Sequence, residues 1–415
     1  MVGPPYIITM STSDNDDLGC FSSPRGELAR RILRVKRNDA AVTSLRLNNV
    51  QYSDEAWGRL GDIVGQSELL DELNISHGDP DVVGLCAGLR NNRCLRRLDF
   101  LGVDLRKELR SLVPFIKGNP HLCDIALAAC NLGPASINIL SEAISDCSLE
   151  RLNLRCNYLG AVDLDVLIQA LSRSKKLTQL RLSCCGIGLS GCTALTTLLR
   201  DRMSNLMELR LNVNSIDDDC TVLLAGALLK NTKLKELALN GNIDLNGKDA
   251  ITAPGWLAML NLVCDTSSID SVLGSNHTLC RLGMTSVDLI KTVGPVLSVD
   301  DANLLRASME ANDHDNKMMP VRCKMVWGHA RRHFNLGKSF IHTGAMPQLL
   351  AWFGAALNAT KSNIIQYHDP PLPREKNDVI RLDSIFRIVS SMPELATAGV
   401  YKEHHIIGES QVNYP

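Results

Sequence analysis

The sequence predicts an α/β solenoid in which a parallel sheet lines one side and helices cover the other. Three observations predict this fold: a Leu-x-Leu phrase that recurs at a narrow period, a switch from strand-like to helix-like spacing inside each period, and an aliphatic composition. Hydrophobic residues make up 45% of the 415-residue chain, and aromatic residues only 4%. Such a composition suits stacked units, each of which covers the apolar face of its neighbour.

The repeat is defined by the first aliphatic residue of each Leu-x-Leu-like phrase, which we call the reference residue. The eight reference residues are separated by 28, 25, 27, 27, 28, 29 and 28 positions. They are Leu45, Leu73, Leu98, Ile125, Leu152, Leu180, Leu209 and Leu237. A period this narrow, sustained over eight copies, is typical of a solenoid. The next candidate, Leu282, follows only after a gap of 45 positions.

Each unit begins as a strand and continues as a helix. Around the reference residue, apolar and polar residues alternate with period 2, which indicates a strand. Further on, the spacing becomes helical: in the fifth unit Leu164, Leu167, Ile168 and Leu171 fall at i, i+3, i+4 and i+7. The sequence therefore predicts a strand, a turn and a helix in every unit.

A polar or sulfur-bearing residue lies five positions after the reference residue in the later units. These residues are Cys130, Asn157, Cys185, Asn214 and Asn242, whereas the first three units carry Val50, Gly78 and Val103. At this position the chain leaves the strand and turns inward, so backbone groups need partners. An Asn amide both donates and accepts, and we expect it to bond to the loop backbone of its own and the next unit. We interpret these five residues as a structural ladder.

These phrases, from about Val42 to Thr285, resemble leucine-rich repeats of the ribonuclease-inhibitor type, LxxLxLxx(N/C)xL followed by a helix. The resemblance implies a right-handed horseshoe with the sheet on its concave face and the helices outside, a cytoplasmic location and protein–protein recognition. The stretches DTSSIDSVLGSNHTL from Asp265 and IRLDSIFRIVSSMPEL from Ile380 are similar, more loosely, to microalgal leucine-rich-repeat proteins of unknown function.

The sequence predicts four segments. We expect a disordered tail at residues 1–23, a solenoid of about eight to nine units at 24–287, a helical segment at 288–398 and a flexible tail at 399–415. The helical segment would begin with a helix capped by Ser298. Capping of the solenoid end is the favoured role for this segment, and a binding role of its own stays open.

Several functional classes are disfavoured. The chain has 44 basic and 45 acidic residues, so its charge favours neither nucleic acid nor membrane surfaces. No apolar run approaches the roughly 18 residues of a membrane span, and the N-terminus lacks a secretory signal pattern. Cys323, His329, His333 and His342 have spacing that favours ordinary surface residues over a zinc site. Phosphate-binding glycine loops and nucleophile motifs are missing, so we expect no enzyme, no cofactor and no metal.

The concave strand face is the candidate binding surface. Side chains beside the reference residues point to this face, and neighbouring strands lie about 4.8 Å apart. Arg155, Arg181 and Arg210 should therefore cluster on three adjacent units, with Asn153 and Asn212 between them. Arginine favours carboxylates, so an acidic protein segment is the expected partner. Alternatively, arginine and glutamate on neighbouring strands simply neutralise one another.

The predicted function is therefore a non-enzymatic protein–protein interaction module that binds its partner on the concave sheet face. The alternative is a GTPase-activating or other enzyme-regulating protein, suggested by a resemblance to Ran GTPase-activating proteins. Those proteins carry an acidic C-terminal tail, whereas this chain ends YKEHHIIGESQVNYP, which disfavours the alternative. The partner's identity, the pathway and the oligomeric state stay open.

Overall fold

The computed structural model describes residues 6–8, 26–283, 286–314, 321 and 324. The chain divides into two compact units, Met1–Met259 with Arg281–Leu297, and Leu260–Cys280 with Ser298–Pro415. Most of the predicted C-terminal helical segment and the zinc candidates Cys323, His329, His333 and His342 lie outside the described residues.

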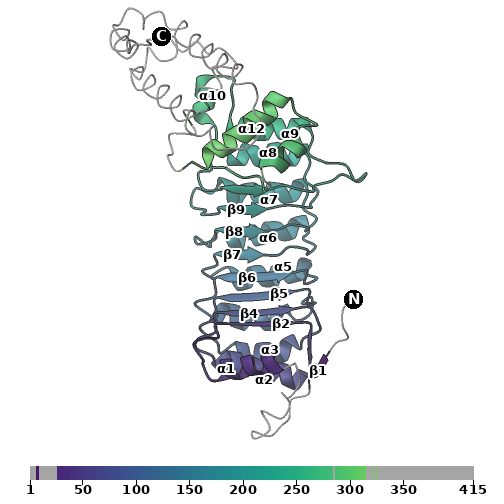
Figure 1. The fold of residues 1–415 in the computed structure, drawn as a ribbon, viewed down its shortest axis with the longest axis vertical. Coiled ribbons are helices and arrows are strands. Elements are labelled where there is room, and N and C mark those ends of the chain that lie inside the picture. Colours follow the sequence, from purple (N-terminus) through teal and green to yellow (C-terminus); the bar gives the residue numbers. More distant parts are fainter. Residues whose placement is uncertain (1–5, 9–25, 284–285, 315–320, 322–323, 325–415) are drawn as a thin grey trace, which may run out of the picture. The chain divides into compact units, whose positions relative to one another are not determined.

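The first unit contains an eight-stranded parallel sheet whose strands follow one another in chain order (Figure 1). The strands are β2 (Ser44–Asn48), β4 (Glu72–Ser76), β5 (Arg97–Leu101), β6 (Asp124–Ala128), β7 (Arg151–Asn153), β8 (Gln179–Arg181), β9 (Glu208–Arg210) and β10 (Glu236–Ala238). In addition β1 (Tyr6–Ile8), inside the segment predicted as a tail, pairs with β3 (Val50–Tyr52).

A helix follows nearly every strand, and the helices form a layer beside the sheet (Figure 1). In the first unit they are α1 (Gly26–Lys36), α2 (Asp54–Gln66), α3 (Val82–Leu89), α4 (Leu109–Gly118), α5 (Pro134–Ile144), α6 (Ala161–Leu171), α7 (Leu189–Arg200), α8 (Asp218–Leu228) and α11 (Ser286–Val293). α9 (Ala253–Val263) runs from the first unit into the second, which holds α10 (Ile269–Gly274) and α12 (Val299–Asn312). As predicted, Ser298 caps α12, its side chain accepting from the Asp301 amide.

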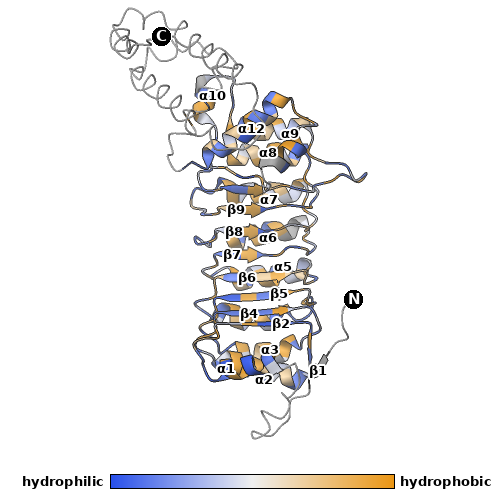
Figure 2. Cartoon of the chain, viewed as in Figure 1, coloured by the Kyte–Doolittle hydropathy of each residue, from blue (hydrophilic) through white to orange (hydrophobic). Residues whose placement is uncertain are grey.

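The predicted register is confirmed. The reference residues of neighbouring strands are direct partners, as in the pairs Leu45–Leu73, Leu152–Leu180 and Leu209–Leu237. All eight reference residues are at most 1% exposed. Figure 2 shows hydrophobic and hydrophilic residues alternating along the strands. The helical spacing of the fifth unit is also confirmed, because Leu164, Leu167, Ile168 and Leu171 are buried on α6.

The irregular gap after Leu237 contains an inserted loop before α9 and the additional helix α10. Leu282 does follow Leu237 in the stack, since Arg281 forms a one-residue parallel bridge with Glu236. The Leu237 amide donates to the Arg281 carbonyl at 2.9 Å, and the Arg281 amide donates to the Lys235 carbonyl at 3.0 Å. Residues 243–249 form a small antiparallel turn within the insertion, through the Ile243–Asp249 bridge. The ninth strand is thus reduced to a bridge that still extends the sheet.

The turn after each strand has one shared backbone feature. The residue four positions after the reference residue has a positive φ in all eight units, between 50° and 68°. These residues are Asn49, His77, Gly102, Ala129, Cys156, Cys184, Val213 and Gly241. A left-handed residue turns the chain sharply out of the strand direction. The chain therefore turns away from the strand direction at the same position in all eight units, and we call this line of residues the turn row.

Helices α2 and α3 approach each other through glycine. A Cβ atom on Gly61 of α2 would overlap the Leu85 carbonyl oxygen of α3, and one on Gly88 of α3 would overlap the Gly61 backbone. Gly65 meets the Gly88 carbonyl oxygen in the same way. The 25-residue unit that contains α3 is the shortest, and α3 has only 8 residues. Bare backbone is what allows these two helices to lie so close.

In the second unit, Lys324 is fully buried and donates hydrogen bonds through its ammonium group. Its Nζ donates to the Asn312 side-chain oxygen at 2.7 Å and to the Asn276 carbonyl at 2.9 Å. The Asn312 amide in turn donates to the Leu279 carbonyl at 2.7 Å. The His277 Nδ1 lies 3.1 Å from Lys324 Nζ. Burial and, to a smaller extent, the neighbouring ammonium lower the pKa of His277 to about 4.

The environment of His277 predicts how the stability of the folded chain depends on pH. The unfolded chain takes up a proton on this imidazole below about pH 6.5, whereas the folded chain resists protonation until about pH 4. Stability contributed by neutral His277 is thus present above pH 6.5 and is lost as the pH falls toward 4. We expect the thermal midpoint to fall less between pH 7 and pH 5 in His277→Gln than in the parent chain. Identical falls in differential scanning calorimetry would contradict this assignment.

Candidate functional site

The structural ladder consists of side chains that satisfy buried backbone groups between repeats. The Asn157 side chain, 4% exposed, donates to the Leu127 and Leu154 carbonyls at 2.7 and 2.8 Å. Its oxygen accepts from the Cys130 and Leu132 amides, both at 3.0 Å. One side chain therefore holds four backbone groups in two units.

Asn214 and Asn242 repeat the arrangement. Asn214 donates to Leu182 and Leu211, and accepts from the amides of Cys185 and Ile187. Asn242 does the same one unit further on. In each case the partners belong to the residue's own unit and to the preceding unit. The expectation that the bonds reach the next unit was wrong, because the Asn side chain packs against the loop of the preceding unit.

The two cysteines of the ladder act as weaker substitutes for Asn. The Cys130 thiol lies 3.4 Å from the Phe100 carbonyl oxygen and 3.3 Å from that of Ala128. The Cys185 thiol contacts the Leu154 carbonyl oxygen at 3.3 Å. Burial raises the pKa of both thiols to about 12. These cysteines are thus protonated donors and poor nucleophiles.

A second row of asparagines, which the repeat pattern did not reveal, secures the other end of the units. Each of these asparagines lies three positions before the leucine that opens a unit. Its side-chain oxygen accepts hydrogen bonds from the backbone amides two and three positions later. The Asn92 oxygen accepts from Cys94 and Leu95 at 3.0 and 2.8 Å. Asn119, Asn231 and Asn276 repeat the pattern. The signal in the sequence is Asn-x-x-Leu, which three of the eight sheet units carry.

The candidate binding face is the side of the sheet away from the helices, which we call the open face. It is formed by the side chains directly before and after the reference residues. In the middle of the sheet, Arg97 Nη2 lies 3.1 Å from Asp99 and Arg97 Nη1 lies 3.5 Å from Asp124. Arg151 Nε donates to Asp124 at 2.8 Å, and this hydrogen bond raises the pKa of the Arg151 guanidinium.

A second network lies on the later strands. Arg181 Nε donates to Glu208 at 3.1 Å, and Arg210 contacts the same carboxylate. Arg210 also reaches Glu236 at 3.4 Å, and Arg281 reaches Glu236 at 3.4 Å. The ion pairing considered as an alternative from the sequence is therefore present. Arg181 and Arg210 are direct register partners on β8 and β9, held together by the carboxylate of Glu208.

The arginines and carboxylates of these networks differ in exposure. The Glu208 and Glu236 side chains are only 13% and 16% exposed, and Asp124 only 7%. The Arg181 and Arg210 side chains are 39% exposed, and Arg281 is 52% exposed. The carboxylates thus lie beneath a layer of guanidinium groups. The open face presents positive charge outward even though its ion pairs are formed.

The remaining predicted site residues have mixed surroundings. Arg155 is exposed and lies two positions after the last residue of β7. Because Asn153 pairs with Arg181, Arg155 corresponds to Ser183 in the neighbouring unit and not to Arg181. The Asn153 side chain accepts from the Arg155 amide at 3.1 Å. The Asn212 side chain accepts from the Asn240 amide at 2.8 Å. Asn153 and Asn212 are half-buried, so they support the strand ends as well as facing the open side.

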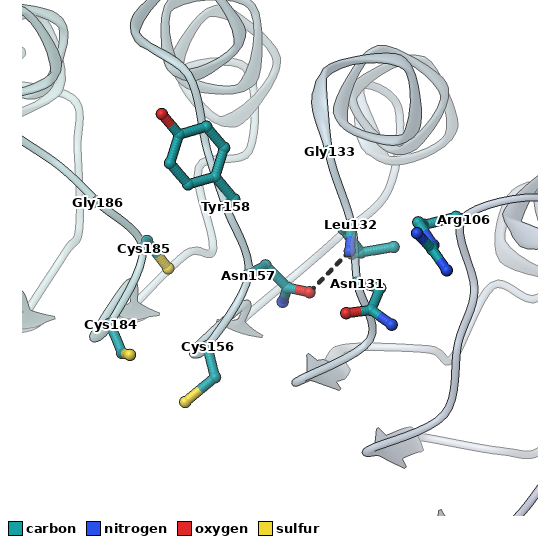
Figure 3. Close-up of a pocket in the computed structure, with 10 residues that line it drawn as sticks. All are labelled: Arg106, Asn131, Leu132, Gly133, Cys156, Asn157, Tyr158, Cys184, Cys185 and Gly186. Atoms are coloured by element: carbon teal, nitrogen blue, oxygen red, sulfur yellow. Dashed lines mark hydrogen bonds between the residues drawn. The ribbon is translucent and has the colours of Figure 1, made fainter.

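An open pocket of about 400 Å³ lies at the turn row, between the loops of the third to sixth units. It is lined by Arg106, Asn131, Leu132, Gly133, Cys156, Asn157, Tyr158, Cys184, Cys185 and Gly186. Figure 3 shows the Cys156 and Cys184 side chains pointing to the same side of the loops, and Tyr158 pointing away from them. Tyr158 is 74% exposed.

Among the described residues, no cluster of three or more His, Cys, Asp or Glu side chains suits a metal ion, and none of the described helices is long and apolar enough to span a bilayer.

Comparisons with known proteins agree with the repeat architecture. The chain is 28% identical to the ribonuclease inhibitor of Mus musculus over 239 residues, which is 55% of this chain and 51% of that protein. It is 26% identical over 296 residues to NACHT, LRR and PYD domains-containing protein 12 of Mus musculus, covering 65% of this chain and 28% of that protein. The chain thus spans about half the length of the inhibitor and less of the larger protein.

Two further comparisons complete the picture. A solved structure of leiomodin-1 actin-binding site 2 aligns with 36% of this chain and 89% of its own, at 15% identity and a TM-score of 0.30. No protein-family profile matches the chain.

Proposed function

Because the chain is built of leucine-rich repeats of the ribonuclease-inhibitor type, we propose that it is a non-enzymatic recognition module that binds an acidic segment of a partner protein on its open face. A ribonuclease inhibitor is, by its name, a protein that acts on another protein, and this supports a protein partner. The reduced thiols that the ladder uses as donors, those of Cys130 and Cys185, support a cytoplasmic location.

The observation that carries the proposal is the layering of charge on the open face. The two ion-pair networks and Arg155 together contribute six arginines against the four carboxylates of Asp99, Asp124, Glu208 and Glu236. The carboxylates are the more buried partners and fix the guanidinium groups in place. A partner carboxylate can therefore bind Arg181 or Arg210 without first ordering a flexible side chain, which lowers the entropic cost of binding.

Rigid presentation also favours recognition over chemistry. The face is held by backbone pairing between eight strands, and protein interfaces of about 1,200–2,000 Å² need such a broad platform. Ion pairs that are already formed give specificity and association rate more than raw affinity. Binding should accordingly weaken with salt, because a Debye length is about 8 Å at physiological ionic strength.

The test measures binding of a fluorescein-labelled poly-glutamate peptide by fluorescence anisotropy. We expect Arg155→Glu/Arg181→Glu/Arg210→Glu to weaken binding at least about tenfold, equivalent to about 1.4 kcal/mol. The matched control is Arg37→Glu/Arg110→Glu/Arg200→Glu, which makes the same change of charge at exposed positions on or next to helices α1, α4 and α7. Equal weakening by both triple variants would reduce the effect to net charge and would contradict the site. A labelled poly-lysine peptide should not bind the parent chain more tightly than poly-glutamate does.

A further inference from the structure

Two exposed thiols face each other across neighbouring repeats. Cys156 and Cys184 occupy the same place in the turn row, with φ of 58° in both. Both are free and exposed. Continued parallel pairing holds their backbones, since the Cys156 amide donates to the Ser183 carbonyl and the Cys184 amide donates to the Asn212 carbonyl, both at 2.9 Å. Figure 3 shows both sulfur atoms on one side of the loops.

From this arrangement we propose that Cys156 and Cys184 are a modification site, a dithiol that a low-molecular-weight disulfide oxidises to a bond between the fifth and sixth repeats. Parallel neighbours lie about 4.8 Å apart, and this spacing falls inside the roughly 4.4–6.8 Å Cα range of natural disulfides. The Cys184 thiol is close enough to contribute to the raised pKa of Cys156, after the larger effect of burial. The inference does not depend on the proposed partner.

Solvent access singles out this pair among the described cysteines. Cys192 and Cys220 have the same spacing of 28 positions. Both are completely buried, however, on α7 and α8. Cys185 directly follows Cys184 in sequence but is also buried. An oxidant in solution therefore reaches Cys156 and Cys184 first.

The reaction proceeds by thiol–disulfide exchange with glutathione disulfide. One thiolate of the pair attacks a sulfur of glutathione disulfide, so a mixed disulfide forms and one glutathione thiolate leaves. The second protein thiolate attacks the protein sulfur of the mixed disulfide and releases the second glutathione. The protein loses two electrons and two protons, and glutathione disulfide gains them as two glutathione thiols.

The pH dependence of the reaction follows from the environment of Cys156. Burial and the neighbouring thiol raise its pKa, while Arg155 lowers it to a smaller extent. Only the thiolate attacks. Closure of the bond should therefore accelerate as the pH rises from 7 to 9, in the full-length folded chain.

The test incubates the full chain with glutathione disulfide, blocks the remaining thiols with N-ethylmaleimide and maps tryptic peptides by mass spectrometry. Arg173 and Lys175 lie between the two cysteines, so trypsin separates them unless they are bonded. We expect a Cys156–Cys184 cross-linked peptide from the parent chain, and the same cross-linked peptide from the Cys185→Ser variant. In Cys156→Ser, Cys184 should instead carry glutathione, because no resolving thiol remains. Cys192 and Cys220 should react only after urea is added.

Three results would overturn the proposal. One is recovery of Cys156 and Cys184 as separate glutathione adducts in the parent chain. Another is a parent chain in which neither residue reacts while it is folded. The third is a cross-link that disappears in Cys185→Ser, which would assign the bond to the buried neighbour.

Discussion

Gly61→Ala should lower the free energy of unfolding by about 1–3 kcal/mol, the range expected when a well-packed site is overfilled. The added Cβ would overlap the Leu85 carbonyl of α3, and backbone cannot rotate away as a flexible side chain can. Helices α2 and α3 would have to separate, and the buried side chains of Trp57, Leu60 and Leu89 would lose part of their packing. Urea unfolding followed by far-UV circular dichroism measures the loss.

The matched control for this substitution lies on the same helix. Gly58 has no atom within 4 Å of the position that a Cβ would occupy. Gly58→Ala should therefore leave stability unchanged or raise it by up to about 1 kcal/mol, since alanine favours helix over glycine. Gly88→Ala should repeat the loss, because Gly88 contacts the Gly61 backbone. Equal effects of Gly58→Ala and Gly61→Ala would show that the close approach of the helices does not exist.

Asn214→Ala is expected to cost about 3–5 kcal/mol, because it leaves two buried amides and two buried carbonyls without partners. Asn214 is 6% exposed, so water does not readily replace its amide group. Hydrogen exchange gives a local readout: the amides of Cys185 and Ile187, which donate to Asn214, should exchange faster than in the parent chain. Urea unfolding gives the global value.

Two companion variants separate ladder bonding from general disturbance of the loop. Ser215→Ala changes the exposed neighbour and should shift stability by less than about 0.5 kcal/mol. Asn214→Cys imitates the ladder cysteines, so it should cost less than Asn214→Ala while leaving the two amides with only a weak sulfur acceptor. If Asn214→Ala and Ser215→Ala were equally mild, the ladder would contribute nothing measurable to stability.

Most of the fold could be predicted from the repeat period, because a constant spacing of aliphatic residues places equivalent residues of successive units side by side. Once Leu152 and Leu180 are placed as direct partners, the side chains on either side of each must face the open side. The role of Asn157 also followed, since a buried turn needs an amide with both donors and acceptors. The direction of its bonds did not follow, because spacing alone does not say which loop lies beneath the side chain.

Other features depend on side-chain rotamers or on close backbone contact, which a repeat pattern does not encode. The sequence placed Arg181 and Arg210 side by side, but it could not show that Glu208 lies beneath both of them. Long side chains have several rotamers of similar energy, and only the surrounding atoms choose among them. The contact through Gly61 could not be predicted from the sequence for a different reason. The sequence does not show whether a glycine inside a helix faces open space or the backbone of another helix.

The turn row concentrates conformational strain along a single edge of the sheet. Glycine and asparagine adopt a left-handed φ at little cost, whereas a β-branched residue does so at a cost of about 1–3 kcal/mol. Val213, with φ of 55°, is the β-branched member of the row. We expect thermal breathing of the sheet to begin at this loop between β9 and α8, so proteases and hydrogen exchange should detect the seventh repeat before its neighbours.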